Sequence, residues 1–359
     1  MLCKRAVTVS KLATLTSVTR LVHVRGSPRG GKTTLALLLA TYFLRNNTPA
    51  ALVASWPVGR KGDDVLIEAA RGAGYPIGSR SELMATDIVF IIDDAETSYK
   101  DEEFWEQTVK SQTGAAQGPR FCVFTSAAHC PPGSPLESLL PEHRVPIFTC
   151  RLGAHRPAAL YFSREEFSEA LNKLSLRLGE KLLLTNCAKR YLWLLSFGHP
   201  GVLRSVVDTL RHVAAPFFFH PALAPWTLTR DKFYHDYLRR RLFDPVSSTR
   251  IAGLVANGLL FEHLRGTVLY GSFVSQRKLT LDAHAVLQRA FNSRQTPFDR
   301  NQPGISQCFQ EGWLHALSAE TGEPGTEFVM VFPSGLHAKY EGCLGLNDSI
   351  DVSSRANND

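Results

Sequence analysis

The sequence predicts an α/β fold, in which helices connect the strands of a parallel sheet. Two observations predict this fold. Short apolar runs of strand length, such as residues 87–92 and 120–124, alternate along the chain with segments of helical periodicity. A glycine-rich loop at residues 26–33 also joins the first predicted strand to an apolar helix, the usual kind of connection in a buried parallel sheet.

The first half of the chain supplies the predicted sheet. The expected strands lie at residues 19–24, 50–55, 87–92 and 120–124, with an edge strand at 159–162. The expected helices lie at residues 35–44, 68–73 and 104–110. A proline-rich loop over residues 131–146 precedes the edge strand.

The glycine-rich loop matches the phosphate-binding pattern GxxxxGK[ST] at every position. Its glycines let successive backbone N–H groups face phosphate oxygens, and the following helix adds its positive N-terminal end. Lys32 is expected to reach the β and γ phosphates, and the Thr33 hydroxyl to hold Mg²⁺. The sequence therefore predicts a P-loop NTPase. The residues expected to bind the nucleotide here are Gly26, Ser27, Pro28, Arg29, Gly30, Gly31, Lys32, Thr33 and Thr34.

An acidic pair follows the apolar strand at residues 87–92. Asp93 and Asp94 are expected at the sheet edge where the phosphates bind. Asp93 is predicted to bind Mg²⁺, and Asp94 to polarise the attacking water. Acidic residues after a strand also cap helices, so the pair has this meaning only together with the phosphate loop.

Polar residues also end the strand at residues 120–124. Thr125 and Ser126 would lie beside the γ phosphate if that strand neighbours the acidic one, where they could sense the phosphate. The alternative, a polar residue that simply closes a strand, is equally compatible with the sequence. The chain contains no NKxD guanine-reading motif, which favours ATP and ADP over guanine nucleotides.

A small helical region is predicted after the sheet. Ser163 and Glu166 form a capping box, so a helix should begin at Ser163. Another helix is expected over residues 182–195, because Gly198 and Pro200 are typical of a helix end.

The remainder of the chain predicts a winged helix. A linker with three prolines covers residues 214–225. A helix followed by a two-stranded hairpin is the winged-helix pattern. The expected helices are 231–242, 249–260, one from residue 280, and 305–311, followed by strands at 313–317 and 327–332.

The predicted division is a P-loop core at residues 1–162, a helical lid at 163–213, linker helices with a winged helix at 214–343, and a disordered tail at 344–359.

Composition narrows the class of protein. A hydrophobic fraction of 44% is ordinary for a globular protein, and no apolar run reaches the ~20 residues of a membrane span. Seven cysteines without metal-ligand spacing indicate free thiols in a reducing compartment. The net charge of +7 is compatible with a nucleic-acid partner or with a plain solvated surface.

The order of these motifs resembles the STAND class of signalling ATPases. More narrowly, VRGSPRGGKTTLA, IIDDAETSYKDEEFW, YFSREEF, FGHPGVL and FVMVFPSGLHAKY resemble the NTPase portion of fungal Crinkler-type proteins, over residues 20–343. The resemblance implies that Gly198 and Pro200 pack against the nucleotide, with Pro200 near the adenine, and that His337 contacts the phosphates in the ADP-bound state. The alternative is an ordinary helix stop at Gly198 and a helix-start histidine at His337.

Two departures from that family bear on activity. The relatives often carry Asp-Glu where this chain has Asp93-Asp94, so the hydrolysis rate is open. They also commonly continue into a nuclease-like domain, whereas this sequence ends shortly after the winged helix, so DNA cutting is not expected. The resemblance implies a cytoplasmic or nuclear location and no membrane partner.

Three functions compete. The leading hypothesis is a regulatory ATPase, in which Mg-ATP controls the lid and the winged helix, with protein partners or a homo-oligomer as the readout. The second is a nucleotide-stabilised module with little turnover, whose basic winged helix and arginine run Arg239-Arg240-Arg241 contact DNA. The third, a small-molecule kinase, predicts a compact arginine-rich lid without a winged helix.

Overall fold

The structure is a computed structural model. It describes residues 4–126, 143–145, 147, 158–176, 182–214, 246–265, 267, 269, 273, 279–293, 296–299, 301–318 and 328–340. The chain folds into two compact units. The core unit comprises Lys4–Ser163 and Val274–Pro333, and the helical unit comprises Met1–Cys3, Arg164–Phe273 and Ser334–Asp359. The residues of each unit are those that contact one another. The predicted domains, with boundaries at residues 162, 213 and 343, stay a prediction.

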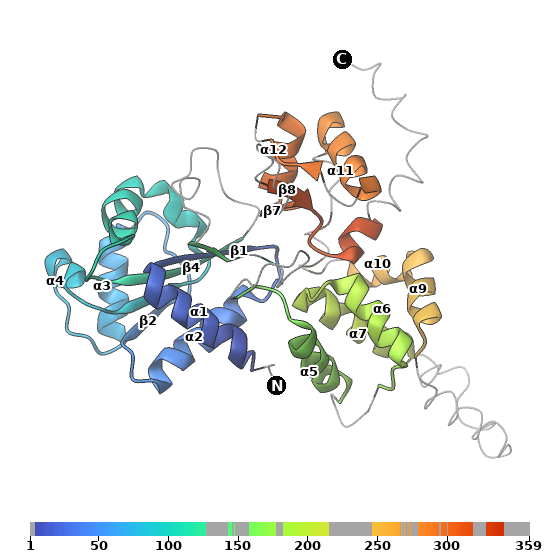
Figure 1. Ribbon diagram of the computed structural model, residues 1–359, viewed down its shortest axis with the longest axis horizontal. Coiled ribbons are helices and arrows are strands. Elements are labelled where there is room, and N and C mark those ends of the chain that lie inside the picture. Colours follow the sequence, from blue (N-terminus) through green and yellow to red (C-terminus); the bar gives the residue numbers. More distant parts are fainter. Residues whose placement is uncertain are drawn as a thin grey trace. The chain divides into compact units, whose positions relative to one another are not determined.

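A five-stranded parallel sheet forms the centre of the core unit (Figure 1). Its strand order is β2-β3-β4-β1-β5, and every neighbouring pair is parallel. The strands are β1 (Leu21–Gly26), β2 (Ala50–Val53), β3 (Val89–Ile92), β4 (Arg120–Ser126) and β5 (Arg144–Val145). This sheet confirms the predicted α/β fold class, and β4 lies between the strand of the phosphate loop and the strand of the acidic pair.

Helices cover both faces of the sheet and bury it. On one face α1 and α2 pack through Leu12, Leu35 and Leu39 against Val22 and other strand residues. The helices of that face are α1 (Ala6–Thr19) and α2 (Lys32–Arg45).

The other face is covered by α3 and by the segments that follow β3. Leu66 and Trp105 are fully buried there against strand residues such as Phe90 and Phe121. Apolar burial on both faces explains why the strands read as continuous apolar runs. The segments are α3 (Gly62–Gly72), α4 (Arg80–Met84), the 3₁₀ turns η1 (Ala95–Lys100) and η3 (Lys110–Gln112), and the π-helical η2 (Phe104–Val109).

Helix α1 has no counterpart among the predicted elements, because part of its buried face is threonine. Thr8 and Thr16 are buried on it beside Val9 and Leu12, so the apolar periodicity is hidden in the sequence. The Thr16 hydroxyl donates to the Leu12 carbonyl at 2.9 Å, which satisfies this polar group within the helix.

The core unit also contains an α+β region, at the place where the sequence predicts the winged helix. Its order along the chain is α11 (Leu281–Ser293), β6 (Thr296–Pro297), α12 (Pro303–Gln310), β7 (His315–Ser318) and β8 (Phe328–Val331). The strands form an antiparallel sheet in the order β6-β8-β7. The expected helices and hairpin strands are present, and the two-residue strand β6 was not predicted.

The helical unit contains α5 (Arg164–Ser175), α6 (Asn186–Ser196), α7 (Pro200–Ala214), α9 (Ser248–Ala256) and α10 (Leu259–Leu264). Helix α5 follows Ser163, as the capping box predicts. No helix within the described ranges is long and apolar enough to cross a membrane.

The predicted edge strand at residues 159–162 is wrong. These residues are irregular, and β5 pairs with β1 at the sheet edge instead. The Arg5 guanidinium takes their backbone acceptors, donating to the carbonyls of Ala159, Leu160 and Tyr161 at 3.0, 2.7 and 3.1 Å. In these residues the carbonyls thus bind a side chain and form no strand ladder.

Two predicted helices have different limits. Residues 182–185 are not helical, because Leu184 forms a β-bridge with Val246 and Thr185 caps α6 through its hydroxyl. The helix predicted over 249–260 is divided into α9 and α10 by Gly258, whose φ of 72° is left-handed. The predicted helix at 231–242, the Arg239–241 run, most of the linker and of the proline-rich loop, the hairpin tip and the tail lie outside the described residues.

The contribution of Arg5 to the stability of the core unit can be tested by mutation. Arg5→Ala removes a buried donor from three carbonyls and should lower the free energy of unfolding by about 3 kcal/mol, as expected for hydrogen bonds to a charged group. Urea denaturation measures this loss. Lys4→Ala, at the exposed neighbouring position, is the matched control and should change the unfolding free energy by no more than about 0.5 kcal/mol.

Candidate nucleotide-binding site

The phosphate loop connects the end of β1 to the start of α2. Two of its residues have left-handed backbone conformations, Arg29 with φ 57° and Gly31 with φ 92°. The Gly30 N–H donates to the Ser27 carbonyl at 3.1 Å, which closes the turn. The loop thus places the unpaired N–H groups of the first turn of α2 at the sheet edge, as the sequence pattern requires.

A side chain on either of two loop glycines would crowd its neighbours. A Cβ on Gly26 would lie 2.1 Å from Cδ2 of Leu160, and a Cβ on Gly30 would lie 3.0 Å from the Ser27 carbonyl oxygen. The Ser27 hydroxyl also forms a 2.8 Å hydrogen bond with the Tyr161 hydroxyl. The segment that Arg5 holds therefore packs directly on the phosphate loop.

Lys32 lies inside the curve of the loop. Its side chain is buried, and Nζ donates to the carbonyls of Gly26 and Ser27 at 3.1 and 3.0 Å. Burial lowers the pKa of Lys32, and the neighbouring carboxylates of Glu96, Asp93 and Asp94 oppose that lowering. The loop thus holds the Lys32 side chain where phosphate is expected.

Asp93 and Thr33 fit a magnesium site. The Asp93 side chain is buried and hydrogen-bonds the Thr33 hydroxyl, yet its Oδ1 has no hydrogen-bond partner among the described residues. Burial raises the pKa of Asp93. A buried carboxylate oxygen without a donor, next to a hydroxyl, is a suitable pair of ligands for an ion that also binds phosphate oxygens. No group of three or more His, Cys, Asp or Glu side chains in the described part of the chain forms a metal site by itself.

Asp94 and Glu96 follow Asp93 in the turn after β3. Asp94 is exposed and has a left-handed backbone conformation at the start of η1. Glu96 is half-buried, and its carboxylate accepts a hydrogen bond from the Ser126 N–H. Glu96 was not among the predicted site residues. The only signal in the sequence is its place three residues after the Asp93 that ends the apolar strand.

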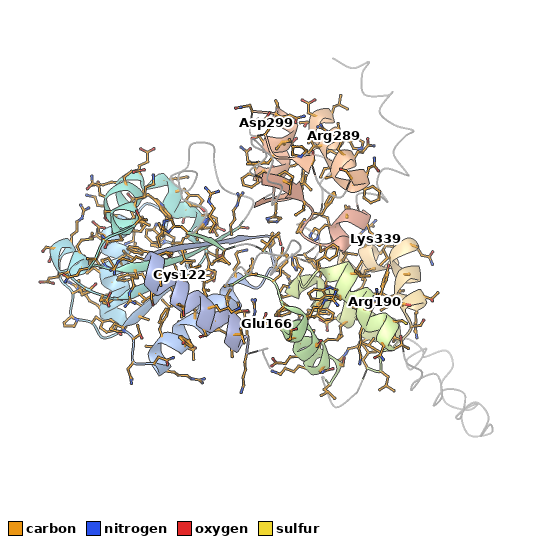
Figure 2. All side chains as sticks on the ribbon, in the orientation of Figure 1. Cys122, Glu166, Arg190, Arg289, Asp299 and Lys339 are labelled. Carbon is orange, nitrogen blue, oxygen red and sulfur yellow. The ribbon has the colours of Figure 1, made fainter. Side chains whose placement is uncertain are left out.

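The two polar residues at the end of β4 have different environments. Figure 2 labels Cys122 in this strand, which pairs with both β1 and β3, as the sensor prediction requires. The Thr125 side chain is fully buried, and its Oγ1 lies 2.7 Å from His23 Nε2. Ser126 is half-exposed and pairs with Gly26 at the start of the loop. Ser126 therefore fits the predicted contact with the γ phosphate better than the buried Thr125 does.

The remaining predicted site residues lie in the helical unit. Gly198, with φ 79°, follows the end of α6, and Pro200 begins α7, so this motif is a turn between two helices. His337 is buried, with its ring centroid 5.7 Å from that of His199, and its Nδ1 lies 2.7 Å from the Ser334 hydroxyl. Burial lowers the pKa of His337 to about 3, so its ring is neutral at physiological pH. Contacts of these residues with a nucleotide stay a prediction.

A contact that the sequence did not indicate joins the phosphate-loop strand to α12. The Arg25 guanidinium lies 3.8 Å from the ring centroid of Phe309 and donates to the Phe309 carbonyl at 3.3 Å. A guanidinium at this distance from an aromatic ring forms a cation–π contact. Because Arg25 immediately precedes Gly26, α12 touches the chain directly before the phosphate loop.

Several solved structures are similar to this chain. The RuvB Holliday junction branch migration motor of Thermotoga maritima is 15% identical over 86% of this chain and 88% of its own, with a TM-score of 0.37. A Walker-type ATPase of Pyrococcus abyssi is 12% identical over 93% and 94%, with a TM-score of 0.43. A structure of Drosophila ORC bound to DNA is 15% identical over 91% and 90%, with a TM-score of 0.27.

These values are too low to assign an activity or a partner to this chain. No protein-family model and no curated protein matches the sequence. The resemblance to STAND ATPases and to Crinkler-type proteins therefore stays a prediction. What is established is an α/β protein with the P-loop NTPase fold, from its sheet order and its phosphate loop.

The buried His23 predicts how stability depends on pH. Burial, followed by the charges of Arg25 and Arg144, lowers the pKa of His23 to about 3. Below pH 6.5 the unfolded chain therefore binds a proton that the folded chain does not, and stability falls as the pH falls. Between pH 7 and pH 5 this group should cost about 2 kcal/mol of unfolding free energy.

The measurement is urea denaturation at pH 7 and pH 5. In His23→Gln the loss between the two pH values should be smaller than in wild type by about 2 kcal/mol. His284→Gln on α11 controls for the loss of one histidine. Equal losses in wild type and His23→Gln would contradict a neutral His23 in the folded chain.

Proposed function

We propose that this chain binds Mg-ATP at the phosphate loop and hydrolyses it to ADP, and that the nucleotide state is communicated to the winged-helix-like region. The observation that carries the proposal is the pairing of a buried Lys32 ammonium inside the loop with a buried, incompletely hydrogen-bonded Asp93 carboxylate beside Thr33. In the described part of the chain Lys32 Nζ donates only to backbone carbonyls and Asp93 Oδ1 has no donor, and Mg-ATP would supply phosphate oxygens to the first and a cation to the second.

The chain's own residues divide the work. The loop N–H groups and Lys32 bind the β and γ phosphates, and Thr33 with Asp93 holds Mg²⁺, which neutralises the charge that develops on the phosphates. Asp94 and Ser126 remain candidates for contact with the γ phosphate, whereas the Thr125 hydroxyl is hydrogen-bonded to His23. Adenine is proposed over guanine because the sequence has no NKxD motif.

The Arg25–Phe309 contact supports a link between the nucleotide and α12. Arg25 and Gly26 are consecutive residues at the end of one buried strand, so they move together when the phosphate loop adjusts. Phe309 is the last residue but one of α12 and contacts Arg25 through both its ring and its carbonyl. Nucleotide binding at the loop is therefore expected to alter α12.

The finer parts of the proposal come from the family resemblance. They are a regulatory role of the STAND kind, a lid formed by the Gly198-His199-Pro200 turn, and a phosphate contact of His337. Protein partners, self-association and contact with DNA also stay proposals, and the Arg239–241 run that would contact DNA lies outside the described residues.

Nucleotide binding and turnover by the purified chain test the proposal directly. Wild type should bind ATP in the presence of Mg²⁺ in preference to GTP, and release phosphate. Lys32→Ala should weaken ATP binding by at least about 100-fold, because it removes the buried ammonium that the proposal places on the phosphates. Fluorescence titration measures binding, and phosphate release measures turnover.

Two controls separate the roles. Asp93→Asn should retain binding without Mg²⁺ and lose the gain in affinity that Mg²⁺ gives. Lys61→Ala, an exposed lysine at the start of α3, is the matched control for Lys32→Ala. Binding of ATP by wild type without turnover would leave only a nucleotide-stabilised module, and no binding at all would refute the proposal.

The link to α12 has its own test. In wild type, Mg-ATP should change amide hydrogen exchange in α12, and Phe309→Leu should reduce that change at least by half, because the cation–π contact with Arg25 is lost. ATP binding itself should be unaltered. Phe291→Leu, at an exposed ring of α11, is the matched control. An unchanged ATP response of α12 in Phe309→Leu would show that the contact does not transmit the nucleotide state.

A further inference from the structure

Glu96 is fixed at the edge of the sheet by the fold around it. The preceding Ala95 is fully buried against the sheet, which anchors the start of η1. The Glu96 side chain then extends from the turn after β3 to the end of β4, where its Oε1 accepts the Ser126 N–H. No other hydrogen bond to the Glu96 side chain occurs within the described part of the chain. One carboxylate oxygen is thus positioned and the other is available.

This position lies beside the phosphate loop. Ser126 is opposite Gly26 in the parallel register of β4 and β1, and neighbouring strands are about 4.8 Å apart. The Gly26 carbonyl in turn accepts a hydrogen bond from Lys32 Nζ. The Glu96 carboxylate and the Lys32 ammonium are therefore attached to paired residues of adjacent strands. Among the carboxylates that raise the pKa of Lys32 against the effect of burial, Glu96 acts more strongly than Asp93 or Asp94.

Asp94 is less well placed to act on a water molecule at the γ phosphate. Its side chain is exposed and makes no hydrogen bond within the described residues. A group that takes a proton in a reaction must be held within hydrogen-bond reach of it, because loss of positioning costs rate. Glu96 is held by a backbone donor, whereas no described residue holds the Asp94 side chain in a comparable way.

We propose that Glu96, and not Asp94, is the catalytic carboxylate that orients the attacking water and accepts its proton. The inference rests on the proposed ATP hydrolysis. In the reaction the water oxygen forms a bond to the γ phosphorus, and the bond from that phosphorus to the β–γ bridging oxygen breaks. ADP leaves with the bridging oxygen, the water proton passes to Glu96, and Glu96 returns it to phosphate or solvent. No further reactant is required.

Glu96→Gln tests the proposal in the full chain, because the glutamine carbonyl oxygen still accepts the Ser126 N–H but cannot take a proton. Turnover should fall by about 100-fold or more, the range expected for loss of a general base. The dissociation constant for Mg-ATP, measured by fluorescence titration, should stay within about threefold of wild type, because no phosphate contact is removed. Thermal unfolding verifies that the variant is folded.

Two variants of the same chemical kind complete the experiment. The loss of turnover in Asp94→Asn should be smaller than the loss in Glu96→Gln by at least about tenfold. Glu102→Gln, at an exposed site, should keep wild-type turnover. A folded Glu96→Gln with near-wild-type turnover would overturn the role of Glu96 and leave ATP hydrolysis standing, as would a larger loss in Asp94→Asn. Wild type that binds ATP without turnover would overturn both the hydrolysis and the role of Glu96.

Discussion

The parallel pairing of β4 between β1 and β3 is the constraint on which the rest of the site depends. This pairing places Gly26 opposite Ser126, and it places the carboxyl end of β3 at the same end of the sheet. Because parallel strands share one direction, their carboxyl ends meet, and the loop, the acidic turn and the polar end of β4 converge without long-range side-chain interactions. Burial of both sheet faces fixes this register, since a shift by one residue would exchange the side chains of the two faces.

The site is held ready at a cost in stability. Lys32 and Asp93 are both buried, and burial disfavours the charged form of each. Asp93 also carries a buried oxygen that has no donor in the described part of the chain. A folded chain tolerates such groups only where the surrounding packing is strong, as under the buried strands here. A ligand that supplies phosphate oxygens to Lys32 and a cation to Asp93 removes both penalties, so binding should stabilise the core unit.

The sequence could suggest only those parts of the candidate site that depend on local chemistry. The phosphate loop and the Asp93-Asp94 pair could be predicted as a candidate site, because glycine, lysine and carboxylate side chains at fixed spacing are recognisable without the fold. Glu96 could not, since its partner Ser126 is distant in sequence and offers only a backbone N–H. Residues 159–162 look like a strand, and only the fold brings Arg5 to their carbonyls. Helix α1 was missed because threonines occupy part of its buried face.

The end of β1 both contacts α12 and leads into the phosphate loop. Side chains alternate along a strand, so His23 and Arg25 lie on one face and Val24 on the other. On the first face His23 contacts Thr125 of β4, and Arg25 contacts Phe309 of α12. On the next residue, Gly26, the chain turns into the phosphate loop. Bending β1 between Arg25 and Gly26 would disturb its pairing with β4, which is why the proposed link expects a displacement of the loop to reach α12.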